Sequence, residues 1–218
     1  MPKKGTAPKM ETDLFAEFAS RVVSRLPRDL EPNVVQGWID DPSSLSRVLR
    51  NALAPEKNGG KIMPPPGGNI HIVSVLVDES RPWNEAVRAA GPNTPTDSDV
   101  WKVGDQYPVK AKALAKNQDV ILVNFGKHVS SEHALKWGKE QKLVPAISRV
   151  CFAVGEQHSK LNDQLAMPYM AVVSLVTCSF GGTQRVTRVW FNETGRGAYL
   201  GWFGIDWNDY DWFAFVRE

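Results

Sequence analysis

Histidines, cysteines and a group of C-terminal aspartates are the side chains of this chain that could support catalysis or metal binding. His128 and His133 lie five residues apart, which misses the one-turn spacing that places two metal ligands on one helix face. Cys151 and Cys178 lie in apolar stretches, where a thiol is not activated as a nucleophile. The sequence contains no HExxH, GxSxG, P-loop or dinucleotide-binding motif. We therefore expect a protein without catalytic activity.

Asp206, Asp209 and Asp211 are close enough in the sequence to suggest a cation site. Clustered oxygen ligands of this kind hold Ca²⁺ in proteins, so calcium is a minor alternative. The spacing of the three aspartates matches no calcium-binding loop. We therefore expect neither a metal nor a cofactor.

The segment from residue 186 to residue 218 combines tryptophans with tyrosine, glycine, aspartate and asparagine. Four of the eight tryptophans of the chain lie here: Trp190, Trp202, Trp207 and Trp212. Core strands favour Val, Ile and Leu with a period of two. Tyr, Asn and Gly are instead typical of adaptable binding surfaces, in which aromatic rings give rigid contact area. The composition therefore predicts a binding surface on an aromatic floor.

Two motifs in this segment, AYLGW at residues 198–202 and WFAFVRE at residues 212–218, resemble the C-terminal region of the variable proteins of diversity-generating retroelements. The resemblance implies a C-type-lectin-like fold and a C-terminal segment rewritten by mutagenic reverse transcription at template adenines. In that family the variable codons begin as Asn codons, which cannot become Trp, Lys, Gln, Glu or Met codons. The sequence agrees, because no lysine follows Lys160, no methionine follows Met170 and no glutamine follows Gln184.

The resemblance also implies which residues form a variable ligand-binding face. They are Tyr199, Gly201, Phe203, Ile205, Asp206, Asn208, Asp209, Tyr210 and Asp211, extended by Thr183, Arg185, Thr187, Arg188, Phe191 and Asn192. Among these we expect Tyr199, Phe203 and Tyr210 to be the aromatic anchors. The fixed, structural residues would be Trp202, Trp207, Trp212, Phe213 and Phe215.

Two other classes of function remain compatible with the sequence. One is a structural or assembly protein, of a phage for example, that uses the aromatic tail as an oligomer interface. The other is an enzyme on a scaffold of the formylglycine-generating type, although Cys151 and Cys178 are far apart in the sequence for a reactive pair. The expected partner is a protein or another macromolecule, and the sequence leaves its identity and the oligomeric state open.

The composition is that of an ordinary soluble globular protein, with 42% hydrophobic and 23% charged residues in a chain of 218. A net charge of +2 predicts no nucleic acid ligand. The basic start is followed by Glu11, Thr12 and Asp13 rather than by an apolar run, so we expect no signal peptide and no membrane insertion. We expect synthesis in the cytoplasm, two buried thiols, and a final location in the cytoplasm or a virion.

The order of the predicted elements indicates an α+β fold, a C-type-lectin-like domain with a short N-terminal helical segment. We predict an unstructured arm at residues 1–10, three helices within residues 11–54, a Pro/Gly linker at 55–68 and a ligand-binding domain at 69–218. The variable region would cover about residues 178–215. Strands are expected at 69–77, 120–124, 170–178, 186–191, 198–203 and 212–216, helices at 82–90, 130–142 and 149–157, and a loop at 93–107.

Overall fold

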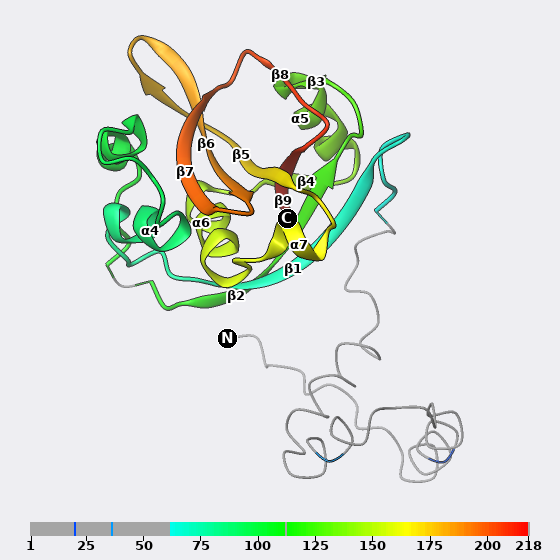
Figure 1. Ribbon diagram of the computed structural model, residues 1–218, viewed down its shortest axis with the longest axis horizontal. Helices are drawn as coiled ribbons and strands as arrows, with labels where there is room; N and C mark the ends of the chain where they lie inside the picture. Colours follow the sequence, from blue (N-terminus) through cyan, green and yellow to red (C-terminus); the bar gives the residue numbers. More distant parts are fainter. Residues whose placement is uncertain (1–19, 21–35, 37–61, 112, 218) are drawn as a thin grey trace, which may run out of the picture. The chain divides into compact units, whose positions relative to one another are not determined.

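The computed structural model describes Ser20, Gln36, residues 62–111 and residues 113–217 (Figure 1). By internal packing the chain divides into two units, Met1–Lys57 and Asn58–Glu218, and the elements described below belong to the second. Ser20 and Gln36 are helical. The rest of the expected arm and N-terminal helices, and the linker up to residue 61, lie outside the described residues.

One seven-stranded mixed sheet organises the second unit, in the order β1–β2–β9–β5–β6–β7 with β4 paired to β9. Its strands are β1 (Asn69–Val77), β2 (Lys116–Asn124), β4 (Leu143–Pro145), β5 (Tyr169–Phe180), β6 (Thr183–Asn192), β7 (Gly195–Trp202) and β9 (Asp211–Arg217). All pairs are antiparallel except β5 with β9. The strand β9 therefore follows β7 in the sequence but lies between β2 and β5.

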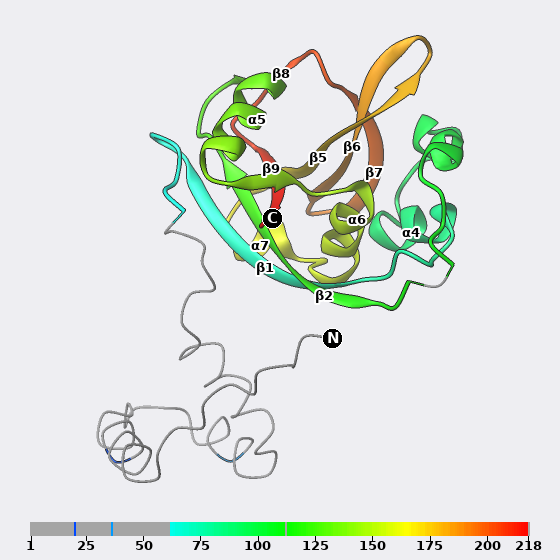
Figure 2. The same ribbon diagram turned by 180° about the vertical axis from the view of Figure 1, so that it is seen from behind.

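A two-stranded sheet and several helices complete the fold. The small sheet pairs β3 (Val129–Ser130) with β8 (Asp206–Trp207). The helices are α4 (Trp83–Ala90), the 3₁₀ helix η1 (Asp99–Gln106), α5 (Ser131–Glu140), α6 (Ser148–Gln157) and α7 (Leu161–Gln164). In both views, α5 lies beside β3 and β8 and apart from α4 and α6 (Figures 1 and 2).

The core consists of two hydrophobic clusters on opposite faces of the large sheet. Alternate residues of β9 show this division, because Trp212 and Ala214 belong to the cluster with α4 and α6, whereas Phe213 and Phe215 belong to the cluster with α5. Side chains alternate between the faces of a strand, so β9 is buried on both sides. This explains why its sequence is a continuous apolar run, as in other strands covered on both faces.

The structure confirms the mixed α+β class and the positions of the main strands and helices. Ser130 caps α5, since its hydroxyl accepts a hydrogen bond from the backbone N–H of His133 at 3.2 Å. The prediction of a loop at residues 93–107 is wrong, because η1 forms there and buries Val100 and Val103. Trp101 anchors this segment, because its Nε1 donates to the Pro95 carbonyl oxygen at 2.7 Å.

Candidate ligand-binding face

The register of the central strands brings several of the predicted residues onto one face of the sheet. Tyr199 of β7 lies opposite Arg188 of β6, and Ala171 of β5 lies opposite both Trp190 of β6 and Asp211 of β9. Directly paired residues project their side chains from the same side of a sheet. We call the group formed by Tyr169, Arg188, Trp190, Tyr199 and Tyr210 the tyrosine face.

Aromatic contacts hold this face together. The Tyr169 and Tyr210 rings meet edge to face, with centroids 4.9 Å apart. The Trp190 and Tyr199 rings are tilted, with centroids 6.4 Å apart. All four rings are partly exposed. They therefore offer rigid, amphipathic contact area beside the connection between β7 and β9.

Trp207 forms the floor beneath that connection. Its side chain is fully buried, its ring meets Phe213 edge to face, and its Nε1 donates to Ser131 Oγ at 2.8 Å. A Cβ atom placed on Gly201 would lie 2.9 Å from the Trp207 ring. Gly201 is buried and leaves the space that this ring fills. Contrary to the expectation of a variable contact residue, Gly201 therefore serves packing.

Residues outside the connection hold its main chain at several points. Ser131 Oγ donates to the Phe203 carbonyl oxygen, and Asn124 Nδ2 donates to the carbonyl oxygens of Asp209 at 2.6 Å and Asp211 at 3.0 Å. The backbone N–H of Ala171 donates to the Tyr210 carbonyl oxygen at 3.1 Å. We call residues 203–210 the display loop. These four bonds use only its main-chain carbonyl groups and that of the adjoining Asp211.

Besides the bond from Trp207 to Ser131, two hydrogen bonds depend on side chains of the display loop or of the residue that follows it. Asn208 Nδ2 donates to the Tyr210 hydroxyl at 2.7 Å, and the backbone N–H of Asn208 donates to Asp211 Oδ2 at 2.9 Å. The second bond forms a local turn closed by the N–H of Asp211 on the Asn208 carbonyl oxygen at 3.1 Å. Asp211 thus shapes the end of the loop.

Two buried polar atoms from oppositely charged side chains in and beside the tyrosine face lack a hydrogen-bond partner among the described residues: Arg188 Nε and Asp211 Oδ1. Burial raises the pKa of the Asp211 carboxyl, and the Asn208 N–H and the charge of Arg188 act against that rise. Burial also raises the pKa of the Tyr169 hydroxyl, which the nearby Arg188 opposes. Buried polar groups are normally hydrogen-bonded, so these two atoms are exceptions to that rule beneath the candidate face.

Several predicted contact residues lie away from this face. Thr187 and Phe191 are fully buried and belong to the opposite side of β6, because side chains alternate along a strand. Asp211 lies on the same side of the sheet as Trp190 but is buried, with only 1% of its surface exposed. Arg185 also lies on the opposite side, with its guanidinium carbon 5.1 Å from the centre of the Trp202 ring. Of the predicted extension on β6, Arg188 and Asn192 have the parity of the tyrosine face, whereas Thr183 is exposed at the start of the strand.

The aromatic residues expected to be structural also differ in burial. Trp207, Trp212, Phe213 and Phe215 are buried, as expected. Trp202 is 51% exposed, so its expected structural role is not supported. It is the last residue of β7.

Apart from the buried Trp207, the display loop is graded from half-buried to exposed. Phe203 and Ile205 pack partly against the cluster around Trp207, whereas Asp206 and Asp209 are exposed. Sequence reasoning missed Tyr169, which precedes the predicted strand by one residue, and the two supporting residues Asn124 and Ser131. A polar residue at each predicted strand end or helix start was the only signal for the supporting pair.

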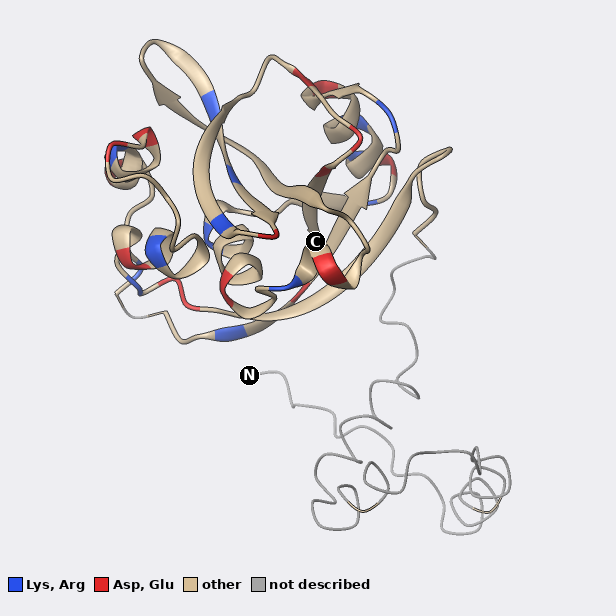
Figure 3. Cartoon of the chain, viewed as in Figure 1, with Lys and Arg blue, Asp and Glu red and all other residues tan. Residues whose placement is uncertain are grey.

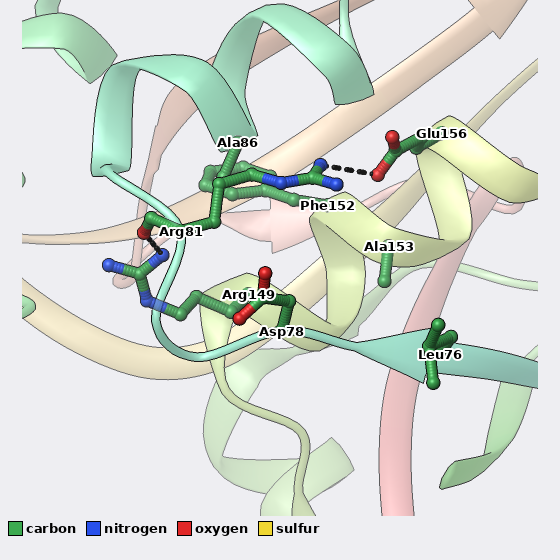
Figure 4. Close-up of a pocket in the computed structure, with 8 residues that line it drawn as sticks. All are labelled: Leu76, Asp78, Arg81, Ala86, Arg149, Phe152, Ala153 and Glu156. Carbon is green, nitrogen blue, oxygen red and sulfur yellow. Dashed lines mark hydrogen bonds and ion pairs between the residues drawn. The ribbon is translucent and has the colours of Figure 1, made fainter. Parts of the chain in front are cut away.

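A separate small cavity lies between the end of β1, α4 and α6 (Figure 4). It is lined by Leu76, Asp78, Arg81, Ala86, Arg149, Phe152, Ala153 and Glu156. Arg81 forms an ion pair with Glu156 at 2.6 Å, and Arg149 donates to the Arg81 carbonyl oxygen. At about 20 Å³ the cavity has room for a water molecule only. These charged groups therefore link structural elements and leave no space for a ligand.

No protein-family profile, curated protein or solved structure matches the chain. Within the described residues, no three His, Cys, Asp or Glu side chains are grouped so that they could hold a metal ion. The helices in that part of the chain are too short or too polar to cross a membrane. Basic and acidic residues are scattered over several elements (Figure 3).

Proposed function

We propose that the protein is a non-catalytic, receptor-like binding protein. The tyrosine face and the display loop together form its ligand-binding surface. In this proposal the fold is C-type-lectin-like and the surface is diversified, as in the variable proteins of diversity-generating retroelements that the C-terminal segment resembles. The expected ligand is a protein or another macromolecule.

The observation that carries the proposal is the way in which the display loop is held. Ser131, Asn124 and Ala171 bind the carbonyl oxygens of Phe203, Asp209, Tyr210 and Asp211. Every residue type has a main-chain carbonyl group, so these bonds survive substitution of the loop side chains. At these carbonyl groups the loop geometry does not depend on side-chain identity, as a diversified surface requires, and the side chains of Trp207 and Asp211 add fixed support.

The chemistry of the surface suits macromolecular recognition. Tyrosine rings lose little conformational entropy on binding and combine apolar area with a hydroxyl group. The loop is held before binding, which lowers the entropic cost of association.

The test is to sequence this gene across many clones of its source population. We expect substitutions at Tyr199, Asp206, Asp209 and Tyr210, and in lower number at the half-buried Phe203 and Ile205. Trp207, Trp212, Asn124 and Ser131 should be unchanged, because they form the floor and the supports of the loop. A display loop that is identical in all clones would overturn the diversification.

A structural or assembly role remains the second candidate, because Trp202 is 51% exposed beside the display loop. An oligomer in analytical ultracentrifugation that dissociates on Phe203→Ser and Tyr210→Ser would favour this role. An enzyme of the formylglycine-generating type is less well supported. Cys151 is fully buried, and burial raises the pKa of its thiol, which suppresses the reactive thiolate.

A further inference from the structure

The strand β7 forms one edge of the large sheet. Its hydrogen bonds show which of its backbone N–H and C=O groups point away from the sheet. The backbone N–H of Phe203 donates inward to the Gln184 carbonyl oxygen at 3.2 Å. In the other direction, the Arg196 carbonyl oxygen accepts from Asn93 N–H at 3.0 Å. In an antiparallel ladder this direction alternates from residue to residue. The even-numbered residues of β7 therefore present their N–H and C=O groups outward.

The first half of this edge is covered. Besides the bond from Asn93 to Arg196, the N–H of Ala198 donates to Thr94 Oγ1 at 2.8 Å. From Leu200 to Trp202, no described residue pairs with the outward groups. The edge is thus open over the end of β7 only.

The surroundings of the open edge are those of a docking site. A cavity of about 220 Å³ lies against it, lined by Pro95, Asp97, Ser98, Asp99, Tyr199 and Leu200. Trp202 is 51% exposed at the end of the edge. Open edges pair readily with extended chains, and a neighbouring exposed aromatic residue adds apolar contact.

The charge around the cavity favours one kind of occupant. Asp97 and Asp99 stand on its wall, and Lys102 pairs with Asp99 at 2.9 Å, which leaves the wall net acidic. A second copy of this chain would bring the same acidic wall to the interface. An extended peptide with lysine or arginine would complement it.

We propose that the edge of β7 at Leu200 and Trp202 binds a basic peptide segment by strand addition, independently of the display loop. The peptide main chain pairs with the outward N–H and C=O groups of Leu200. Its basic side chains face Asp97 and Asp99, and its apolar side chains contact Trp202. The site depends on main-chain groups, so it does not require the diversified residues.

The test follows amide hydrogen exchange at Leu200 by NMR, with a short capped peptide of alternating lysine and valine as the probe. Saturating peptide should slow exchange of the Leu200 amide by about tenfold or more, because the amide becomes hydrogen-bonded. A version of the peptide with alternate N-methylated residues, and a glutamate–valine version, should leave this amide unprotected. Equal protection by all three peptides, or none by the first, would overturn the proposal.

Two variants test the contact directly. Leu200→Pro removes an N–H that points away from β6, so the sheet tolerates it as an edge proline, and it should abolish binding of the lysine–valine peptide. Leu200→Val keeps the N–H and should bind as the native chain does. Unchanged binding to Leu200→Pro, with native-like circular dichroism, would contradict strand addition. Protection of Leu200 without peptide that grows with protein concentration would instead show pairing of two copies and overturn the peptide assignment.

Discussion

β9 and the display loop are neighbours in the sequence, yet they are stabilised in opposite ways. In β9 the side chains of Trp212, Phe213 and Phe215 are buried in the two core clusters, so the residue types set the structure. In the display loop the main-chain carbonyls are held from outside, and side chains such as Asp209 are exposed. The comparison shows how stability and recognition can be assigned to different atoms within a short stretch of chain.

The largest expected effect is at β9. Trp212→Ala removes an indole that is 4% exposed and whose Nε1 lies 3.2 Å from Met167 Sδ. The lost packing should lower the free energy of unfolding by about 3–5 kcal/mol. Chemical denaturation followed by circular dichroism measures this. A loss as small as that of an exposed residue would mean that β9 is not the centre of the core.

Asn124→Ala should have the next largest effect, because it removes the donor to the Asp209 and Asp211 carbonyl oxygens and the acceptor for the Gly126 N–H. We expect a loss of about 1–3 kcal/mol in the free energy of unfolding. The amides of residues 208–211 should also exchange faster with solvent. Asn124→Asp is the control, since it keeps the acceptor and lacks the donor. If it protected the loop as asparagine does, the carbonyl contacts would not be what holds the loop.

Tyr210→Ala should change stability by less than about 1 kcal/mol, because it removes only a partly exposed ring and the bond from Asn208. Binding to any ligand selected on the native protein should fall much more. The measurement pairs thermal unfolding with titration of that ligand. Equal destabilisation by Tyr210→Ala and Trp212→Ala would remove the distinction between loop and strand.

Asp211→Asn should give the smallest effect and act through pH. The folded state raises the pKa of Asp211 above 3.8, so it holds the proton more tightly than the unfolded chain does. The resulting contribution of Asp211 to the free energy of unfolding is fully present below its pKa in the unfolded chain. It is lost as the pH rises through its pKa in the folded protein. The variant should not lose this stability as the pH rises. Chemical denaturation at several pH values from acid to neutral measures the difference. If stability depended on pH in the variant as it does in the native protein, Asp211 would not be the source of this pH dependence.

The sequence was sufficient to predict the parts of the fold that rest on strong periodicity. The strand at Asn69–Val77 and the buried run of β9 have apolar patterns that indicate a strand without tertiary information. The sequence did not show which residues of β6 point to which face of the sheet. The register with β5 and β7 decides that Thr187 faces one side and Arg188 the other. η1 also required tertiary contacts, since Gly104 packs against Trp83 and Val100 is buried.

The candidate site was predicted in outline but not in its supports. Tyr199, Arg188 and Tyr210 were identified from composition and resemblance, and they lie in or beside the tyrosine face. Asn124 and Ser131 act through main-chain atoms of distant residues, 85 and 72 positions away along the chain for Asp209 and Phe203. A single polar residue at a strand end or helix start does not indicate which distant carbonyl group it will bind.

The position of β9 in the middle of the sheet has a consequence for synthesis. Because β9 follows the display loop in the sequence, a product that stops or shifts frame within the loop lacks the strand between β2 and β5. Both of these strands would then expose unpaired edges, which promote aggregation and clearance by chaperones and proteases. Only a chain translated in frame through the display loop can therefore complete the large sheet.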